Sequence, residues 1–187
     1  MSKPSKNNPG PRPASIAAQN VKKPLVFMMG RSPAFLAVDR GYARNHMWAS
    51  VVENGCRWGL SAYAVRLLGD MERLEWEIEP GSTVRRGQRI GTIEASKATS
   101  DLYCPMDGAV GQINPAVVKD PTLLNSNLYD DGWLFTVLGA EPELLSPEQY
   151  LGHLEASWPL AQRVLKGQVS LGRQGDQSER DEASWQN

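Results

Sequence analysis

Apolar and polar residues alternate along much of the middle of the chain, which is the pattern of half-buried β-strands. The clearest case is the segment in which Leu74, Trp76 and Ile78 alternate with three glutamates. Asn54-Gly55 supplies the residue pair that suits the positive φ of a hairpin turn. The expected strands cover residues 47–52, 56–60, 74–79, 89–94, 101–105, 108–114 and 133–138. The pattern therefore predicts a mainly β fold.

A few short helices interrupt this pattern. Ser61 can cap a helix that Gly69 would end, because serine accepts from free helical N–H groups and glycine suits a helix stop. Ser146 and Gln149 form a capping box that opens a later helix, and we expect Pro159 to break or restart it, with a second short helical piece that ends at Gly167. The expected helices cover residues 62–68, 121–124 and 147–158.

The chain divides by composition into one domain and two tails. Residues 1–24 are rich in proline, carry several basic residues and have no acid, and residues 166–187 are polar, so we predict that both are disordered. A mitochondrial targeting role for the first segment is disfavoured by its prolines. Residues 25–165 are predicted to form the domain. Within it, residues 25–39 could add an edge strand or lie over the surface, and the sequence leaves this open.

Charge and cysteine content exclude several classes of function. A net charge of −1 gives no field that would attract nucleic acid or an anionic membrane. The apolar run at residues 25–29 ends at Gly30, well short of a membrane span. Cys56 and Cys104 are far apart, and only His46 and His153 accompany them, so no zinc set is expected. Both cysteines are predicted to be buried thiols of a reducing compartment.

Lys97 is the candidate for chemistry. It stands between two expected strands in a turn where its neighbours, Ser96 and Ala98, are small. About one in 10³ of such exposed amines is neutral at pH 7, and the nearby Glu94 and Asp101 favour the charged form. Lys97 is therefore a poor nucleophile, but its slim surroundings suit a side chain that another enzyme must modify. The competing interpretation is an ordinary surface lysine.

Residues 94–105, EASKATSDLYCP, resemble the lipoylation motif of the glycine cleavage system H-protein family. Further segments resemble that family in the same order: residues 45–48, 59–64, 68–70, 108–114, 124–126 and 129–134. The resemblance spans about residues 42–154. It implies a lipoyl/biotinyl-type flattened barrel, the barrel-sandwich hybrid, made of two small antiparallel sheets. It also implies lipoate in amide linkage on Lys97, with Glu94 and Asp101 recognised by the lipoate-attaching enzyme. The alternative role for these two carboxylates is hairpin solubility and turn hydrogen bonds.

The resemblance implies a carrier and not an enzyme. Such a protein shuttles an aminomethyl group from glycine decarboxylase to aminomethyltransferase, and dihydrolipoyl dehydrogenase reoxidises its lipoate. A lipoate ligase or lipoyl transferase would load Lys97. The expected location is the cytoplasm, or the mitochondrion in a eukaryote.

Two departures from the family pattern keep other functions open. Met47 stands where the family usually has a glutamate that can help to hold the cationic aminomethyl arm, and Ala62 replaces an aspartate. These changes favour a second hypothesis, a related lipoate-bearing protein that serves sulfur oxidation or passes lipoate to other carriers. A third hypothesis is an interaction module of the same fold with Lys97 unmodified.

Overall fold

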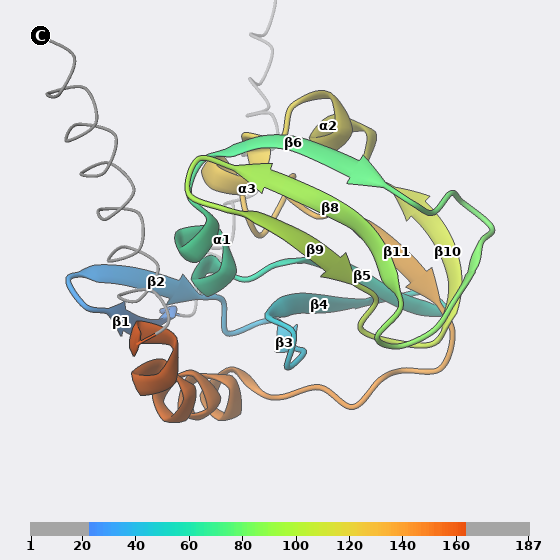
Figure 1. Cartoon of the computed structure of the whole chain (residues 1–187). Coiled ribbons are helices and arrows are strands. Elements are labelled where there is room, and N and C mark those ends of the chain that lie inside the picture. The colour runs from blue at the N-terminus through green and yellow to red at the C-terminus, as the bar shows by residue number, and fades with distance from the viewer. Residues whose placement is uncertain (1–22, 164–187) are drawn as a thin grey trace, which may run out of the picture.

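The computed structural model describes residues 23–163. Two antiparallel sheets face each other as a flattened sandwich (Figure 1). The larger sheet has the order β3-β4-β5-β11-β10-β7, with bounds Gly41–Tyr42, Met47–Val52, Gly55–Leu60, Phe135–Leu138, Gly108–Ile113 and Thr83–Val84. The smaller sheet has the order β6-β8-β9, with bounds Met71–Trp76, Arg89–Ala95 and Thr99–Tyr103. The mainly β fold with two flattened antiparallel sheets is thus confirmed, although one sheet has six strands.

The core lies between the two sheets and explains the alternation in the sequence. Trp58, Ile90, Ile93 and Phe135 are fully buried there. Along β6, the side chains of Leu74 and Trp76 pack against this core and the glutamates face solvent. The strand begins at Met71 and ends at Trp76, so it lies three residues earlier than predicted.

The first helix has the ends that the sequence predicts. Helix α1 covers Ala62–Leu68, the Ser61 hydroxyl accepts a hydrogen bond from Ala64 N at 3.2 Å, and Gly69 follows with φ of 93°. Helix α3 (Leu123–Ser126) is close to its predicted place, whereas α2 (Pro115–Lys119) was not predicted. The signal for α2 was present, since Asn114 caps it and proline occupies its first turn.

The C-terminal helix starts as predicted but continues further. Ser146 and Gln149 form the capping box, with Gln149 N 3.2 Å from Ser146 Oγ and Ser146 N 2.8 Å from Gln149 Oε1. The predicted interruption at Pro159, a break or a restart, is wrong, because one helix covers residues 147–163 of the described chain. Proline removes the hydrogen bond to the carbonyl of Glu155, but both residues are exposed, so water can satisfy that carbonyl.

The segment that the sequence left open forms a separate hairpin of β1 (Leu25–Met29) and β2 (Ser32–Leu36). It is a two-stranded sheet of its own, beside α1 and the C-terminal helix (Figure 1, blue). Phe27 is buried in contact with Tyr63 and Trp158, with ring centroids 5.8 and 5.7 Å apart. The predicted tails lie outside the described residues, apart from Lys23 and Pro24.

Both cysteines are free and buried, as predicted, and burial raises the pKa of each thiol. Among residues 23–163, no group of three or more His, Cys, Asp or Glu side chains is placed to hold a metal ion. None of the helices in this part of the chain is long and apolar enough to cross a membrane.

Candidate functional site

Lys97 lies at the tip of the β8–β9 hairpin. Strand β8 ends at Ala95 and β9 begins at Thr99, so the turn consists of Ser96, Lys97 and Ala98. All three side chains of the turn are exposed. The structure therefore presents the lysine as the sequence predicts, with no bulky neighbour beside it in the chain.

The backbone of this turn is held by the end of helix α1. Lys97 N donates to Leu68 O at 3.0 Å, and Ser96 N donates to Asp70 O at 2.9 Å. In return, the Ser96 hydroxyl accepts from Asp70 N at 2.9 Å. Because three hydrogen bonds join the two segments, the turn backbone is held against the domain, while the Lys97 side chain is exposed.

Gly69 and Asn125 also belong to this site, although no pattern in the sequence predicts them there. Asn125 donates to Gly69 O and accepts from Met71 N, both at 2.9 Å, and so fixes the segment that holds the turn. A Cβ at Gly69 would lie 2.5 Å from Ser96 Oγ and 3.0 Å from Lys97 Cγ. Gly69 was predicted only as a helix stop, because the close approach of a distant turn leaves no local signal.

The Lys97 side chain lies over Gly69 and points along α1. Its Nζ is 3.5 Å from Arg66 O, a long contact, and it forms no ion pair with any described residue. It borders a groove of about 410 Å³, the Lys97 groove, between β2, α1 and α3. Other residues that line this groove include Phe35, Val65, Arg66, Leu124, Leu128 and Tyr129. The amine is thus accessible and has a partly apolar groove next to it.

Glu94 and Asp101 are both paired with arginines across the strands. Arg73 holds Glu94 in a bidentate pair, with N–O distances of 2.8 and 3.1 Å. Arg89 Nε lies 2.9 Å from Asp101 Oδ1 and also pairs with Glu77. All of these groups are well exposed, so the pairs contribute little to stability. Any enzyme that reads Glu94 and Asp101 would meet two ion pairs and not two free carboxylates.

A second, smaller cavity of about 160 Å³ lies between α1 and the start of β4. Met47 lines it and is only 2% exposed. Leu60, Leu67 and Leu68 supply further apolar walls, and Asp101 is the one acidic residue among its lining residues. This cavity, the Met47 pocket, is therefore mainly apolar.

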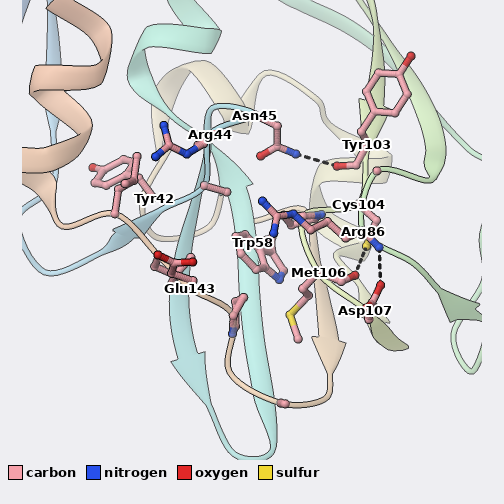
Figure 2. Close-up of a pocket in the computed structure, with 17 residues that line it drawn as sticks. Tyr42, Arg44, Asn45, Trp58, Arg86, Tyr103, Cys104, Met106, Asp107 and Glu143 are labelled. Carbon is pink, nitrogen blue, oxygen red and sulfur yellow. Dashed lines mark hydrogen bonds between the residues drawn. The ribbon is translucent and has the colours of Figure 1, made fainter.

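A third cavity, of about 480 Å³, does not contain Lys97, Glu94 or Asp101 in its lining. Figure 2 shows it between the loop that carries Arg44 and Asn45 and the turn that carries Arg86. The Asn45 amide donates to Tyr103 O at 2.9 Å, and Arg86 N donates to Asp107 at 2.7 Å. These bonds join the loops at the end of β9 away from Lys97, so this cavity is separate from the candidate site.

A partly buried polar cluster ties the C-terminal helix to the turn before β4 and to the N-cap of α1. His46 Nδ1 and Ser61 Oγ lie 3.0 and 2.9 Å from the Tyr150 hydroxyl. Burial, with His153 nearby, lowers the pKa of His46 to about 4. The neutral imidazole is therefore the form that the folded protein contains at pH 7.

We expect the protein to lose stability as the pH falls from 6.5 to about 4. The unfolded chain protonates His46 near its ordinary pKa of 6.5, whereas the folded chain protonates it only near pH 4. The free energy of unfolding that depends on neutral His46 is therefore fully present above pH 6.5 and decreases as the pH falls from 6.5 to about 4. The loss from this group is at most about 3 kcal/mol. Urea unfolding at pH 7, 5.5 and 4.5 measures it. His46→Asn, which tolerates the φ of 66°, should flatten this part of the profile, and an unchanged slope would contradict the assignment.

Known proteins are similar to the part of the chain that contains the candidate site. The family model for the glycine cleavage H-protein matches residues 40–156, which include the hairpin that carries Lys97. A glycine cleavage system H protein of Thermobifida fusca is 46% identical over 114 residues, covering 60% of this chain and 90% of the relative. That of Rubrobacter xylanophilus is 42% identical over 118 residues, covering 63% and 93%.

A solved structure agrees with these relatives. The crystal structure of a glycine cleavage system H protein from Mycobacterium marinum superposes with a TM-score of 0.56 and 33% identity, and the match covers 62% of this chain and 95% of that one. The hairpin β1–β2 lies before the residues that the family model matches. The chain belongs to the glycine cleavage H-protein family.

Proposed function

We propose that this protein is the lipoyl carrier of a glycine cleavage system, with lipoate attached to Lys97. The observation that carries the proposal is the exposed lysine on a fixed hairpin tip, inside the segment that matches the family. The site fits the group, because Nζ has no ion pair with a described residue and both flanking side chains are small. An attaching enzyme can therefore reach the amine without moving the backbone.

The chemistry would come from the cofactor, and the protein would supply presentation. Bound lipoate provides a disulfide that undergoes two-electron reduction and can accept a carbon group on one sulfur. The chain holds the attachment point rigid through the α1 contacts and leaves the side chain mobile. The partners we propose are glycine decarboxylase, aminomethyltransferase, dihydrolipoyl dehydrogenase and a lipoate ligase or lipoyl transferase. Glu94 and Asp101, with their arginine partners, are proposed as features that the attaching enzyme reads.

Intact-mass and peptide mass spectrometry of protein purified from its native host tests the proposal. We expect a lipoyl adduct on the peptide that contains Lys97, and the loaded protein should support glycine–bicarbonate exchange with glycine decarboxylase. An unmodified Lys97, in cells whose other lipoyl proteins are modified, would overturn the proposal. It would leave the family membership unchanged and favour the unmodified interaction module.

The boundaries of the domain and its compartment belong to the same proposal. We propose residues 25–165 as the domain, because β1 begins at Leu25 and the C-terminal helix packs on the core through Tyr150 and Leu154. The two buried free thiols suit a reducing compartment, and we propose the cytoplasm.

One observation favours a second candidate, a lipoyl carrier with a different cargo. The Met47 pocket offers a cationic aminomethyl group one acidic side chain, that of Asp101, and Arg89 already pairs with it. Met47 itself is an apolar wall. A neutral or sulfur-based cargo would suit this pocket better than a cation would, because a cation in apolar surroundings needs an unpaired carboxylate.

Replacing Met47 by glutamate separates the two candidates. We expect Met47→Glu and Met47→Gln each to lower the free energy of unfolding by about 2 kcal/mol, because both bury a polar group in a mainly apolar pocket. If the cargo is aminomethyl, the glutamate variant should exceed the glutamine variant in aminomethyl transfer at equal folded fraction. Equal transfer by the two variants would favour the second candidate. Urea unfolding and the exchange assay supply the two measurements.

A further inference from the structure

The hairpin β1–β2 is a sheet of two strands, so each strand has an outer edge with which no other described strand pairs. Its inward side chains, Phe27, Ala34 and Leu36, are buried in one cluster with side chains of α1 and the C-terminal helix. Figure 1 shows the hairpin at the left of the molecule, where it projects beyond both larger sheets. An open edge on a strand that is fixed to the domain can template a further strand.

The register of the hairpin identifies the backbone groups that point outward. Opposite residues of an antiparallel pair alternate between hydrogen-bonded and non-hydrogen-bonded pairs. Pro33 has no N–H and lies opposite Met28, so these two residues form a non-bonded pair. The next non-bonded pair is Val26 with Phe35, which agrees with the acceptance by Phe35 O of a hydrogen bond from the Tyr129 hydroxyl at 2.8 Å. The N–H and C=O groups of Val26 and Met28 therefore point to the outer edge of β1.

The two edges of the hairpin differ in their protection. On β2, Pro33 supplies no donor and the Tyr129 hydroxyl occupies Phe35 O. On β1, no residue of the described chain forms a hydrogen bond with the outward N–H and C=O groups of Val26 and Met28. Their side chains are 41% and 51% exposed. The outer edge of β1 thus lacks the backbone protection that β2 has.

Strand β1 also lacks the charges that protect other edges. The outer strands of the smaller sheet, β6 and β9, carry Glu72, Glu75 and Asp101, and such charges discourage pairing with another chain. The sequence of β1, LVFMM, has no charged residue. Lys23 and Arg31 flank the strand without interrupting it. This edge is therefore suited to pair with another apolar strand.

We propose that the outer edge of β1 pairs with the same edge of a second copy of this chain, antiparallel about a two-fold axis at Phe27. In this register Val26 of one copy lies opposite Met28 of the other, so each outward N–H meets an outward C=O. The half-buried Leu25 of one copy likewise lies opposite the half-buried Met29 of the other. A strand that is apolar along its whole length is self-complementary, as a two-fold interface requires.

The dimer should be weak, because the paired edge is short and like charges meet at its ends. The register places Lys23 of one copy near Arg31 of the other, a repulsion that salt screens. A pairing of this length buries less area than a standard stable interface. Association should therefore be measured at moderate salt and high protein concentration.

The pairing leaves the candidate site accessible. Phe35 of β2 lines the Lys97 groove, whereas no residue of β1 lines it. The dimer therefore presents two Lys97 side chains at once, which raises avidity for a partner with more than one binding site. This inference goes beyond the proposed function and does not depend on lipoylation.

Sedimentation velocity of the full-length protein tests the pairing, from about 5 to 500 µM in about 0.3 M NaCl. The mass should rise with concentration from 20.6 kDa toward twice that value. Met28→Pro removes the outward N–H, as Pro33 does on β2, and Val26→Lys adds a charge to the edge. Each should weaken association by at least about tenfold. Val118→Lys is the matched control and should associate like the parent, because Val118 is similarly exposed on α2, away from the hairpin (Figure 1).

Amide hydrogen exchange by NMR identifies what covers the edge. In dilute protein the Val26 and Met28 amides should exchange fast and the Phe27 amide, which bonds to β2, slowly. At about 500 µM the Val26 and Met28 amides should exchange about threefold more slowly. Protection that is the same at every concentration would mean that another segment of the same chain covers the edge, and would overturn the proposal.

Two results of the sedimentation experiment would also overturn it. One is a monomer at about 500 µM, and the other is association that survives Val26→Lys. Thermal melts verify that the variants are folded, and Val26→Lys carries the comparison if Met28→Pro melts early. The Lys97→Arg variant should dimerise like the parent, so an absence of lipoate would overturn the proposed function and leave this inference standing.

Discussion

We expect Lys97→Arg to abolish carrier activity and to leave the fold intact. The side chain is exposed, and its one hydrogen bond among the described residues is a 3.5 Å contact from Nζ to Arg66 O, so the free energy of unfolding should change by no more than about 0.5 kcal/mol. Arginine keeps the positive charge but is always protonated, so it offers no amine for an amide bond to lipoate. We expect the exchange of bicarbonate with glycine to fall to the level without carrier.

Lys119→Arg provides the control for this loss. Lys119 is also exposed, in the last turn of α2, and does not line the Lys97 groove. The control variant should carry the lipoyl adduct and retain full exchange of bicarbonate with glycine. The Lys97→Arg variant should lack both the adduct and the exchange, and should melt at the same temperature as the control. Exchange by Lys97→Arg above background would remove Lys97 from the function.

The sequence predicts this site well where local patterns determine it. The alternation of apolar and polar residues in β8 and the small residues of the turn place Lys97 at a hairpin tip. The cap at Ser61 and the stop at Gly69 place α1 correctly. These features depend on residues within one element or one turn, so their signals are short-range and readable.

The parts that were not predicted depend on contacts between distant segments. Nothing around residue 69 signals that the turn at Ser96 packs against it, and the pairing of Glu94 with Arg73 follows from the register of β6 on β8. The placement of β1–β2 was left open for the same reason, because it depends on Phe27 meeting Tyr63 and Trp158. Such long-range packing is not encoded in periodicity and becomes visible only in the folded structure.

Gly69→Ala should damage the site more than its small size suggests. The residue has φ of 93°, and the new methyl group would lie 2.5 Å from Ser96 Oγ and 3.0 Å from Lys97 Cγ. Gly69 also has ψ of −146°, outside the left-handed helical region, so backbone strain costs about 1–3 kcal/mol, and the clash adds to it by pushing the lysine turn away from α1. We expect a loss of about 2–4 kcal/mol in the free energy of unfolding. The initial rate of lipoate attachment should fall about tenfold, because the attaching enzyme then meets a turn that is no longer fixed.

Gly81→Ala separates the two causes. Gly81 has nearly the same φ, 90°, but a Cβ there would meet nothing within 4 Å, so this variant carries the backbone strain alone. Its free energy of unfolding should fall by about 1–2 kcal/mol, and it should accept lipoate at the normal rate. The two variants are compared in their free energy of unfolding and in their rate of lipoate attachment. The difference in these two quantities measures what the contact between α1 and the turn contributes to the presentation of Lys97. If Gly69→Ala is lipoylated as fast as Gly81→Ala, the backbone hold on the turn is not required, and presentation depends on the small flanking side chains alone.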